Sequence, residues 1–353
     1  GSDDERTLNR NTEAFDDCDL VPKILANVGK PDLSTTVFGR KISMPIFLSP
    51  AAMQRLYHPE GDKASARAAE KFNTFYSMST MSNNSIEQIA NLSSGPKLFQ
   101  LYIHKDQSIT DDLIDRCKRA NFDGLCLTVD TIVAGNRERD HRTGFTTPPK
   151  LTLKSLFSFA IKPKWVFDYL TNEKFELSNV KNKTDKGTNI TKSVIEYINE
   201  QYDPGMNWSD AEYVVKRWDK PFAIKGVMSV EDAKRAVDIG CTAIMISNHG
   251  GRQLDGSRSP FDQIKLISDA VGDKVDIILD GGVRRGTHVL KAIAAGAKAC
   301  SFGKAFLFSL SAGGQKGVEK LLQNMHDEIQ RNMILMGFKN LKDLNYSRLI
   351  FRR

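Results

Sequence analysis

The sequence has few residues that could cross-link it or carry it through a bilayer. It contains only five cysteines in 353 residues, and none of them forms a Cys-x-x-Cys pair. Several lie inside apolar runs, which indicates buried thiols in a reducing compartment rather than disulfides or a zinc site. We therefore expect a cytoplasmic protein without a bound metal. No run of 18 apolar residues occurs, so we expect no membrane-spanning segment.

The chain is basic overall, but its Lys and Arg residues are not clustered in one segment. Fifty Lys and Arg residues against 43 Asp and Glu give a net charge of +7. There is no dense Lys/Arg block, zinc finger or aromatic-basic RNA signature, so nucleic acid is not an expected partner. The surplus fits either solvated surface lysines or an attraction to anionic lipid or anionic substrates.

Short apolar runs alternate with amphipathic stretches along most of the chain. Helices are predicted near 60–72, 83–91, 107–120, 230–239, 260–271 and 286–295, and two further helices within about 314–336. Such an alternation predicts an α/β protein with a parallel sheet, although periodicity alone does not separate a closed barrel from a doubly wound sheet. The predicted strands are 45–49, 74–78, 97–102, 124–129, 221–225, 242–247, 275–280 and 298–302.

One gap, residues 131–220, is too long for an ordinary connection and predicts an insertion or lid loop within a single domain 1–353. Its residues 151–170 are apolar and basic, with Leu, Phe and Trp beside lysines. They fit either a helical cover packed on the sheet or an interfacial membrane segment. Residues 171–192 are polar and predict a mobile or disordered stretch, and 193–218 predict a return to helix.

The most informative stretch is TAIMISNHGGRQLDG, residues 242–256. An apolar, β-branched run is followed at once by His249, Gly250, Gly251 and Arg252. An α/β barrel displays its catalytic groups at the carboxyl ends of its strands. His249 is the candidate base, because neutral imidazole accepts a proton near pH 7. Arg252 suits a substrate carboxylate, because its planar guanidinium can bind both oxygens.

These residues carry a resemblance to a known family. SNHGGRQLDG, with AIKGV before it and DGGVRRG after it, resembles the FMN-dependent L-2-hydroxy acid oxidases and dehydrogenases, from Asp4 to about Gly337. LTLKSLF and GTHVLKA are most similar to bacterial L-lactate dehydrogenases that pass electrons to quinone or cytochrome. The resemblance implies a (β/α)8 TIM barrel with a long insertion after strand 4 and extra C-terminal helices, FMN as the cofactor, and a homotetramer.

The implied reaction is oxidation of an L-2-hydroxy acid, L-lactate first, to the 2-oxo acid, pyruvate. Quinone is the implied acceptor if residues 150–170 attach the protein to the cytoplasmic face of the inner membrane. Two alternatives stay open: a glycolate or other 2-hydroxy acid oxidase using O₂, and a non-redox phosphate-binding barrel enzyme. The second needs the same late glycines but no flavin contacts.

The resemblance also assigns the flavin site. Glycine-rich turns after two late strands supply backbone N–H groups for a phosphate. Asp280 is expected to hold the ribityl hydroxyls, with Gly281 and Gly282 beside it. Arg284, Gly303 and Lys304 are expected to bind the phosphate, and Lys304 stands at a position where the family usually has arginine. The residues expected around the flavin ring are Ala52, Ser79, Gln100, Thr128, Lys225 and Ser247, and the Lys225 cation is expected to stabilise the reduced ring.

The remaining assignments concern the substrate. Asp130 matches the carboxylate that pairs with the catalytic histidine, and Tyr102 matches a phenol that binds the substrate. Arg137 matches a second carboxylate-binding arginine. Met81 is expected beside the substrate side chain, where a flexible apolar residue favours small substituents. The family also has a substrate-binding tyrosine a few residues before the position of Gly1, which the printed sequence does not contain.

Overall fold

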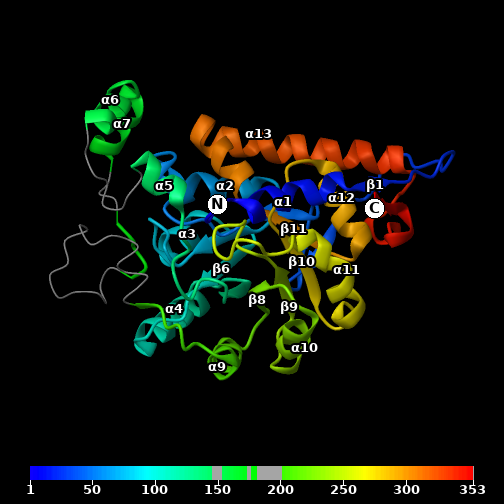
Figure 1. Ribbon diagram of the computed structural model, residues 1–353, viewed down its shortest axis with the longest axis horizontal. Coiled ribbons are helices and arrows are strands. Elements are labelled where there is room, and N and C mark those ends of the chain that lie inside the picture. Colours follow the sequence, from blue (N-terminus) through cyan, green and yellow to red (C-terminus); the bar gives the residue numbers. More distant parts are fainter. Residues whose placement is uncertain (145–152, 173–175, 181–200, 353) are drawn as a thin grey trace.

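A computed structural model describes residues 1–144, 153–172, 176–180 and 201–352 (Figure 1). Eight parallel strands form a closed barrel, which confirms the predicted fold. The strands lie within a few residues of their predicted positions. They are β4 (Ile46–Leu48), β5 (Tyr76–Ser79), β6 (Lys97–Leu101), β7 (Gly124–Thr128), β8 (Phe222–Val227), β9 (Ala243–Ile246), β10 (Asp276–Asp280) and β11 (Ala299–Phe302).

The barrel strands are buried on both faces, and their side chains change from apolar to polar along the length of each strand. A set of apolar side chains that includes Leu98, Cys126, Ala223, Ile278 and Ala299 forms one buried cluster. Side chains two positions apart on a strand point to the same face. The residues two places later, towards the carboxyl end of each strand, are polar: Gln100, Thr128, Lys225, Asp280 and Ser301. The strand period thus places an apolar layer beneath a polar one, and the polar layer marks the carboxyl end of the barrel.

Helices surround the barrel as the amphipathic pattern predicts. Ser85 and Asn207 begin α3 and α9 with capping boxes, which satisfy free N–H groups at the helix start. The helices are α2 (Gly61–Lys71), α3 (Ile86–Leu92), α4 (Gln107–Arg119), α9 (Trp208–Trp218), α10 (Val230–Asp238), α11 (Pro260–Val271), α12 (Gly286–Ala295) and α13 (Lys304–Met336).

The prediction of two helices within 314–336 is wrong. α13 begins directly after β11, the last strand of the barrel. It is interrupted once, at Gly313 and Gly314, whose backbone angles are not helical. Gly314 has a φ of 56°, a conformation that glycine adopts without strain. One helical segment therefore precedes the break and one follows it.

The sequence analysis did not predict the elements at the chain ends. α1 (Arg6–Asp16) runs beside the loops that follow β9 and β10 (Figure 1). β1 (Cys18–Leu20) pairs with β12 (Leu349–Phe351) in a separate two-stranded sheet. A hairpin of β2 (Thr35–Val37) and β3 (Arg40–Ile42) lies near the amino end of the barrel, where the backbone N–H of Phe38 donates to Asp276.

The insertion follows β7, the fourth strand of the barrel, as predicted. It contains α5 (Glu138–Thr143), α6 (Leu153–Ala160) and α7 (Pro163–Thr171), and α6 and α7 stand away from the barrel (Figure 1). Residues 145–152, 173–175 and 181–200 lie outside the described residues. They include parts of the predicted 150–170, 171–192 and 193–218 segments. In 193–218 the structure describes helix α9 from Trp208 onward.

The α6–α7 pair exposes its apolar side chains. Leu153, Phe157, Phe167 and Leu170 are 88%, 71%, 65% and 73% exposed. A packed cover would turn these side chains inward, so the exposure favours the interfacial alternative. Trp165 anchors α7, because its indole N–H donates to the Leu56 carbonyl at 2.9 Å. In the described part of the chain, no helix combines the length and the apolar character needed to cross a bilayer.

Candidate active site

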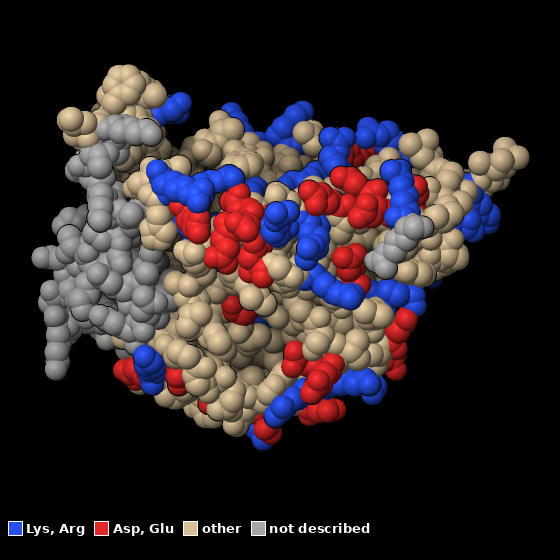
Figure 2. All heavy atoms as spheres, in the orientation of Figure 1, with Lys and Arg blue, Asp and Glu red and all other residues tan. Residues whose placement is uncertain are grey.

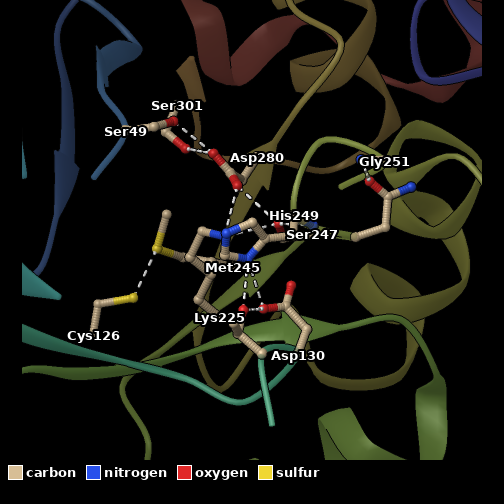
Figure 3. A network of polar contacts seen from close by, with 12 residues as sticks. Ser49, Cys126, Asp130, Lys225, Met245, Ser247, His249, Gly251, Asp280 and Ser301 are labelled. Atoms are coloured by element: carbon tan, nitrogen blue, oxygen red, sulfur yellow. Dashed lines mark hydrogen bonds and ion pairs between the residues drawn. The ribbon is translucent and has the colours of Figure 1, made fainter. Parts of the chain in front are cut away.

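Polar side chains from successive strands meet at the carboxyl end of the barrel. Ser79, Gln100, Thr128, Lys225 and Asp280 end β5, β6, β7, β8 and β10, or lie near their ends, and each is at most 6% exposed. Ser247 follows β9 directly and is fully buried. The structure thus brings together five of the six residues that were assigned to the flavin ring, all except Ala52, with Asp280, which was assigned to the ribityl hydroxyls. Figure 3 shows part of this network from close by.

An ion pair lies at the centre of the network. Lys225 Nζ is 3.1 Å from Asp280 Oδ2 and donates to Ser247 Oγ, also at 3.1 Å. Burial opposes the lysine charge, but the carboxylates of Asp280 and Asp130 outweigh it and raise the pKa of Lys225 above its usual value. Burial likewise opposes the Asp280 charge, but Lys225 and the neighbouring hydroxyls hold the pKa of Asp280 at about 2. Lys225 is therefore a permanent buried cation.

Three serines complete the shell around Asp280. Ser49 and Ser301 each donate to Oδ1 at 2.6 Å, and Ser247 donates to Oδ2 at 2.8 Å. Ser49 follows β4 and Ser301 lies in β11, so the first and the last barrel strand along the chain both contribute. The sequence analysis did not assign a role to Ser49, although its place directly after an apolar strand is the same signal that identified Ser247.

His249 and Asp130 form the second network. His249 Nδ1 is 2.9 Å from Asp130 Oδ1 and 3.1 Å from Thr131 Oγ1 (Figure 3). Burial would raise the pKa of Asp130, but the charges of His249 and Lys225 outweigh it, so that pKa lies below its usual value. An ionised carboxylate on Nδ1 orients the ring and leaves Nε2 for a substrate. His249 has a φ of 56°, an uncommon conformation for a residue with a side chain.

Four cations surround these networks. Arg137, Arg252, Arg284 and Lys304 form no ion pair with a carboxylate in the part of the chain that the structure describes. Burial, and then the charge of Arg252, lower the pKa of Arg137. Burial, and then the charges of Arg284 and Arg252, lower the pKa of Lys304. Like charges that lie close together and form no ion pair of their own are stabilised by a bound anion.

The glycine-rich turn after β10 approaches the first helix closely. Gly281 and Gly282 have φ values of 114° and 74°, and a Cβ on Gly282 would lie 2.0 Å from the Asn11 carbonyl oxygen. Gly303 is the residue before α13, whose first residue is Lys304. Backbone N–H groups at such a helix start, together with Arg284 and Lys304, fit a phosphate group. The predicted phosphate residues thus follow β10 and β11.

Two tyrosines and a methionine lie beside this site. The rings of Tyr102 and Tyr202 are 4.7 Å apart, and Tyr202 Oη is 3.5 Å from Met81 Sδ. Burial raises the pKa of Tyr102 to about 12, so its phenol remains a hydrogen-bond donor at neutral pH. The sequence analysis missed Tyr202, because it lies within the insertion, far from Tyr102 in the sequence, and no local motif marks it.

Two buried polar atoms test whether FMN fits this end of the barrel. Gln100 Nε2 and Thr128 Oγ1 have no hydrogen-bond partner among the described residues, although their side chains are almost fully buried. Buried polar groups in native proteins are nearly always paired. Thr128 on β7 pairs in register with Lys225 on β8, and Gln100 lies on β6, the strand on the other side of β7. An isoalloxazine ring, with its carbonyl and N–H groups, would supply the missing partners, so the residues present fit the cofactor.

Comparison with known proteins agrees with this site. The family model for FMN-dependent dehydrogenases matches residues 1–351. The chain is 38% identical to glycolate oxidase of Spinacia oleracea over 349 residues, covering 99% of this chain and 89% of the relative. It is 37% identical to L-lactate oxidase of a Nostoc species over 356 residues, covering 98% and 90%.

A solved structure is also similar to this chain. The crystal structure of the monotopic membrane protein (S)-mandelate dehydrogenase superposes with a TM-score of 0.93 at 31% identity, covering 99% of this chain and 92% of that one. The non-redox alternative is thereby set aside. The chain belongs to the family of FMN-dependent dehydrogenases, and FMN is its cofactor.

Proposed function

We propose that the protein oxidises an L-2-hydroxy acid to the corresponding 2-oxo acid, with L-lactate as the substrate and pyruvate as the product. The three relatives named above carry names that refer to glycolate, L-lactate and mandelate, which are all 2-hydroxy acids. The observation that carries the proposal is the His249–Asp130 pair, together with Arg137 and Arg252, which lie close to each other and form no ion pair with a carboxylate of the described residues.

Each side chain has a defined part in binding. Arg252 and Arg137 bind the substrate carboxylate, because two guanidinium groups with no carboxylate partner of their own can each donate two hydrogen bonds. Tyr102 donates its phenolic hydrogen to the bound substrate, since its raised pKa keeps it protonated. Met81 and Tyr202 are packed against each other, which limits the room beside the substrate. A methyl group fits this arrangement better than an aromatic ring.

His249 accepts the substrate proton. Its Nδ1 faces the ionised Asp130, so Nε2 is the free basic nitrogen, and the imidazolium that forms is stabilised by the neighbouring carboxylate. The same base serves whether the first proton leaves the hydroxyl group or the Cα. FMN supplies the chemistry that the side chains lack, because it accepts two electrons from the substrate. Lys225, charged and buried, favours negative charge that develops beside it.

The electron acceptor is proposed to be quinone or cytochrome, reached at the cytoplasmic face of a membrane. The exposed apolar side chains of α6 and α7 support a peripheral contact, and the mandelate dehydrogenase with which the chain superposes is described as a monotopic membrane protein. In Figure 2 the α6–α7 protrusion, at the upper left, is mainly uncharged. A homotetramer remains a prediction from the family resemblance.

A second candidate is a glycolate oxidase that uses O₂. It is favoured by the 38% identity to the spinach enzyme over nearly the whole chain. Anaerobic stopped-flow reduction of the bound flavin by L-lactate, glycolate, L-mandelate and longer hydroxy acids identifies the substrate. Reoxidation of the reduced protein by O₂, a quinone in vesicles and cytochrome then identifies the acceptor. Fast reduction by glycolate with fast reoxidation by O₂ would replace the first proposal by the second.

A further inference from the structure

Four of the groups assigned to the substrate lie on two loops that are far apart in sequence. Asp130 and Arg137 belong to the loop after β7, and His249 and Arg252 belong to the loop after β9. Catalysis by a histidine–aspartate pair requires that these two loops keep a fixed relative position. A displacement of about 1 Å can cost roughly 10²-fold in rate.

One side chain joins the loops at three points. Gln253 Nε2 donates to the carbonyl oxygen of Asp130 at 3.0 Å and to that of Val133 at 2.8 Å. Gln253 Oε1 accepts from the backbone N–H of Gly135 at 3.2 Å. The carboxamide thus bonds to the backbone of the opposite loop, from the catalytic aspartate to two residues before Arg137.

The backbones of the two loops also meet directly. A Cβ on Gly135 would lie 2.2 Å from the carbonyl oxygen of Arg252, so only glycine fits there without a shift. Arg252 is the residue before Gln253, and it shares a positive environment with Arg137. The carboxamide holds together two loops whose guanidinium groups repel each other.

We propose that Gln253 is a positioning residue for the reaction: it sets the distance between His249 and Asp130 and the separation of Arg137 and Arg252. The inference rests on the proposed function, because those four residues are its catalytic and carboxylate-binding groups. A carboxamide is suited to this task, since it donates two hydrogen bonds and accepts at a third point without adding charge. Glutamate cannot donate, and methionine makes none of the three bonds.

The test compares Gln253→Met with the wild type and with Gln323→Met. Gln323 lies on the exposed side of α13 and bonds only to Asp327 within the described residues, so it controls for the same substitution elsewhere. Anaerobic flavin reduction by the hydroxy acid that reduces the wild type fastest is measured per bound flavin, together with FMN content and the thermal midpoint.

Gln253→Met is expected to lower the limiting reduction rate about 10²-fold and to raise the substrate concentration at half-maximal rate, because both the base and the carboxylate clamp are displaced. FMN content should match the wild type, since Gln253 bonds to Asp130, Val133 and Gly135 and to none of the residues assigned to the flavin. Gln253→Glu should lose rate as well, because its carboxylate faces two carbonyl oxygens. Gln323→Met should behave as the wild type.

Two results would overturn the inference. One is a Gln253→Met protein with reduction rate and substrate affinity within twofold of the wild type. The other is loss of FMN from both Gln253 variants, which would make the residue structural. A wild type that no 2-hydroxy acid reduces would instead reject the proposed function, so the two failures are distinguishable.

Discussion

At the scale of single residues, the site separates charges that are compensated within the protein from charges that are not. Lys225 has Asp280, and His249 has Asp130. Arg137, Arg252, Arg284 and Lys304 have no such partner among the described residues, and these cations are the ones assigned to anionic ligands. Lys225 and His249 are thus compensated within the protein, whereas these four cations remain available to an anionic ligand.

Replacing His249 by Gln should leave FMN bound and lower the rate of flavin reduction by about 10²–10⁴-fold or more, because general base catalysis is worth that much and Asp130 acts with the histidine. Anaerobic stopped-flow spectroscopy measures the rate. His326→Gln, on the exposed surface of α13, is the matched control. Bleaching of the His249 variant at the wild-type rate would remove His249 from the proposed mechanism.

Lys225→Met should act on both the flavin and the acid stability of the protein. Without the cation, reduced flavin loses its stabilisation, so the midpoint potential should fall. The pKa of Asp280 is held at about 2 in the folded protein, below its usual 3.8. The unfolded chain then binds the proton more readily, so this stabilisation is present above about pH 4 and is lost as the pH falls towards 2.

Removing Lys225 raises the pKa of Asp280, and acid unfolding should begin at a higher pH. Lys97 provides a control, because it is a buried lysine at the start of β6 that donates to backbone carbonyls of Ser93 and Gly95. Lys97→Met should leave the flavin potential unchanged. An unchanged potential in Lys225→Met as well, measured by dye-equilibrated reduction, would contradict the role of the buried cation.

At the scale of elements, α1 packs beside the loop that carries His249 and holds it in place. Asn11 and Asn248 exchange two hydrogen bonds at 2.8 and 2.7 Å, and Asn248 also accepts from the backbone N–H of Gly251 at 3.2 Å. Thr7 adds a bond from its backbone N–H to Asp255 at 2.7 Å. The loop that carries His249 is therefore fixed by hydrogen bonds to a helix that lies nearly 240 residues earlier in the chain.

Asn11→Ala should lower the free energy of unfolding by about 1–3 kcal/mol, because it removes two buried hydrogen bonds of Asn248, whose amide then keeps, among the described residues, only its bonds to Gly251 and Arg258. Flavin reduction should slow as the loop loosens. Chemical denaturation of the holoprotein measures the first effect and stopped-flow spectroscopy the second. Asn9→Ala, an exposed position on the same helix, is the control, and equal losses in the two variants would contradict the support role.

Local patterns in the sequence predicted the strands and helices, whereas the closed barrel and most of the site residues were implied by the resemblance to a known family. Apolar runs located the strands, and the polar residues at their ends, such as Lys225 and Asp280, had to meet at one end of a closed barrel. The roles of Asn11, Tyr202 and Gln253 could not be predicted in this way. Each depends on a partner more than 90 residues away, and a single asparagine or glutamine carries no local sign of the backbone that it will bind.

At the scale of the whole molecule, two features favour binding to an anionic membrane: the net charge of +7 and the exposed apolar side chains of α6 and α7. Vesicles containing anionic lipid should bind the protein at low salt and release part of it at high salt, because the attraction between charges is screened and the apolar contact is not. Flotation with the vesicles measures the binding.

Replacing Phe157, Phe167 and Leu170 by Ser should abolish flotation and leave reduction of the flavin intact. The matched control replaces Leu25, Phe308 and Leu335 by Ser, since these apolar side chains are equally exposed on other parts of the molecule. Flotation of the first variant at the wild-type level would reject the membrane contact through this pair of helices, and a soluble acceptor would then be the better proposal.

The anchoring of Trp165 has an optical consequence. The chain has three tryptophans, of which Trp218 is fully buried and Trp208, the first residue of α9, lies under the guanidinium of Arg235. Trp165 alone belongs to the α6–α7 pair, where its ring stacks between Phe159 and Tyr169 and its N–H is bonded to Leu56. Its indole emission is therefore an intrinsic signal of what surrounds these helices. A blue shift that vesicles produce in the wild type and not in Trp165→Phe would report their entry into lipid without any added label.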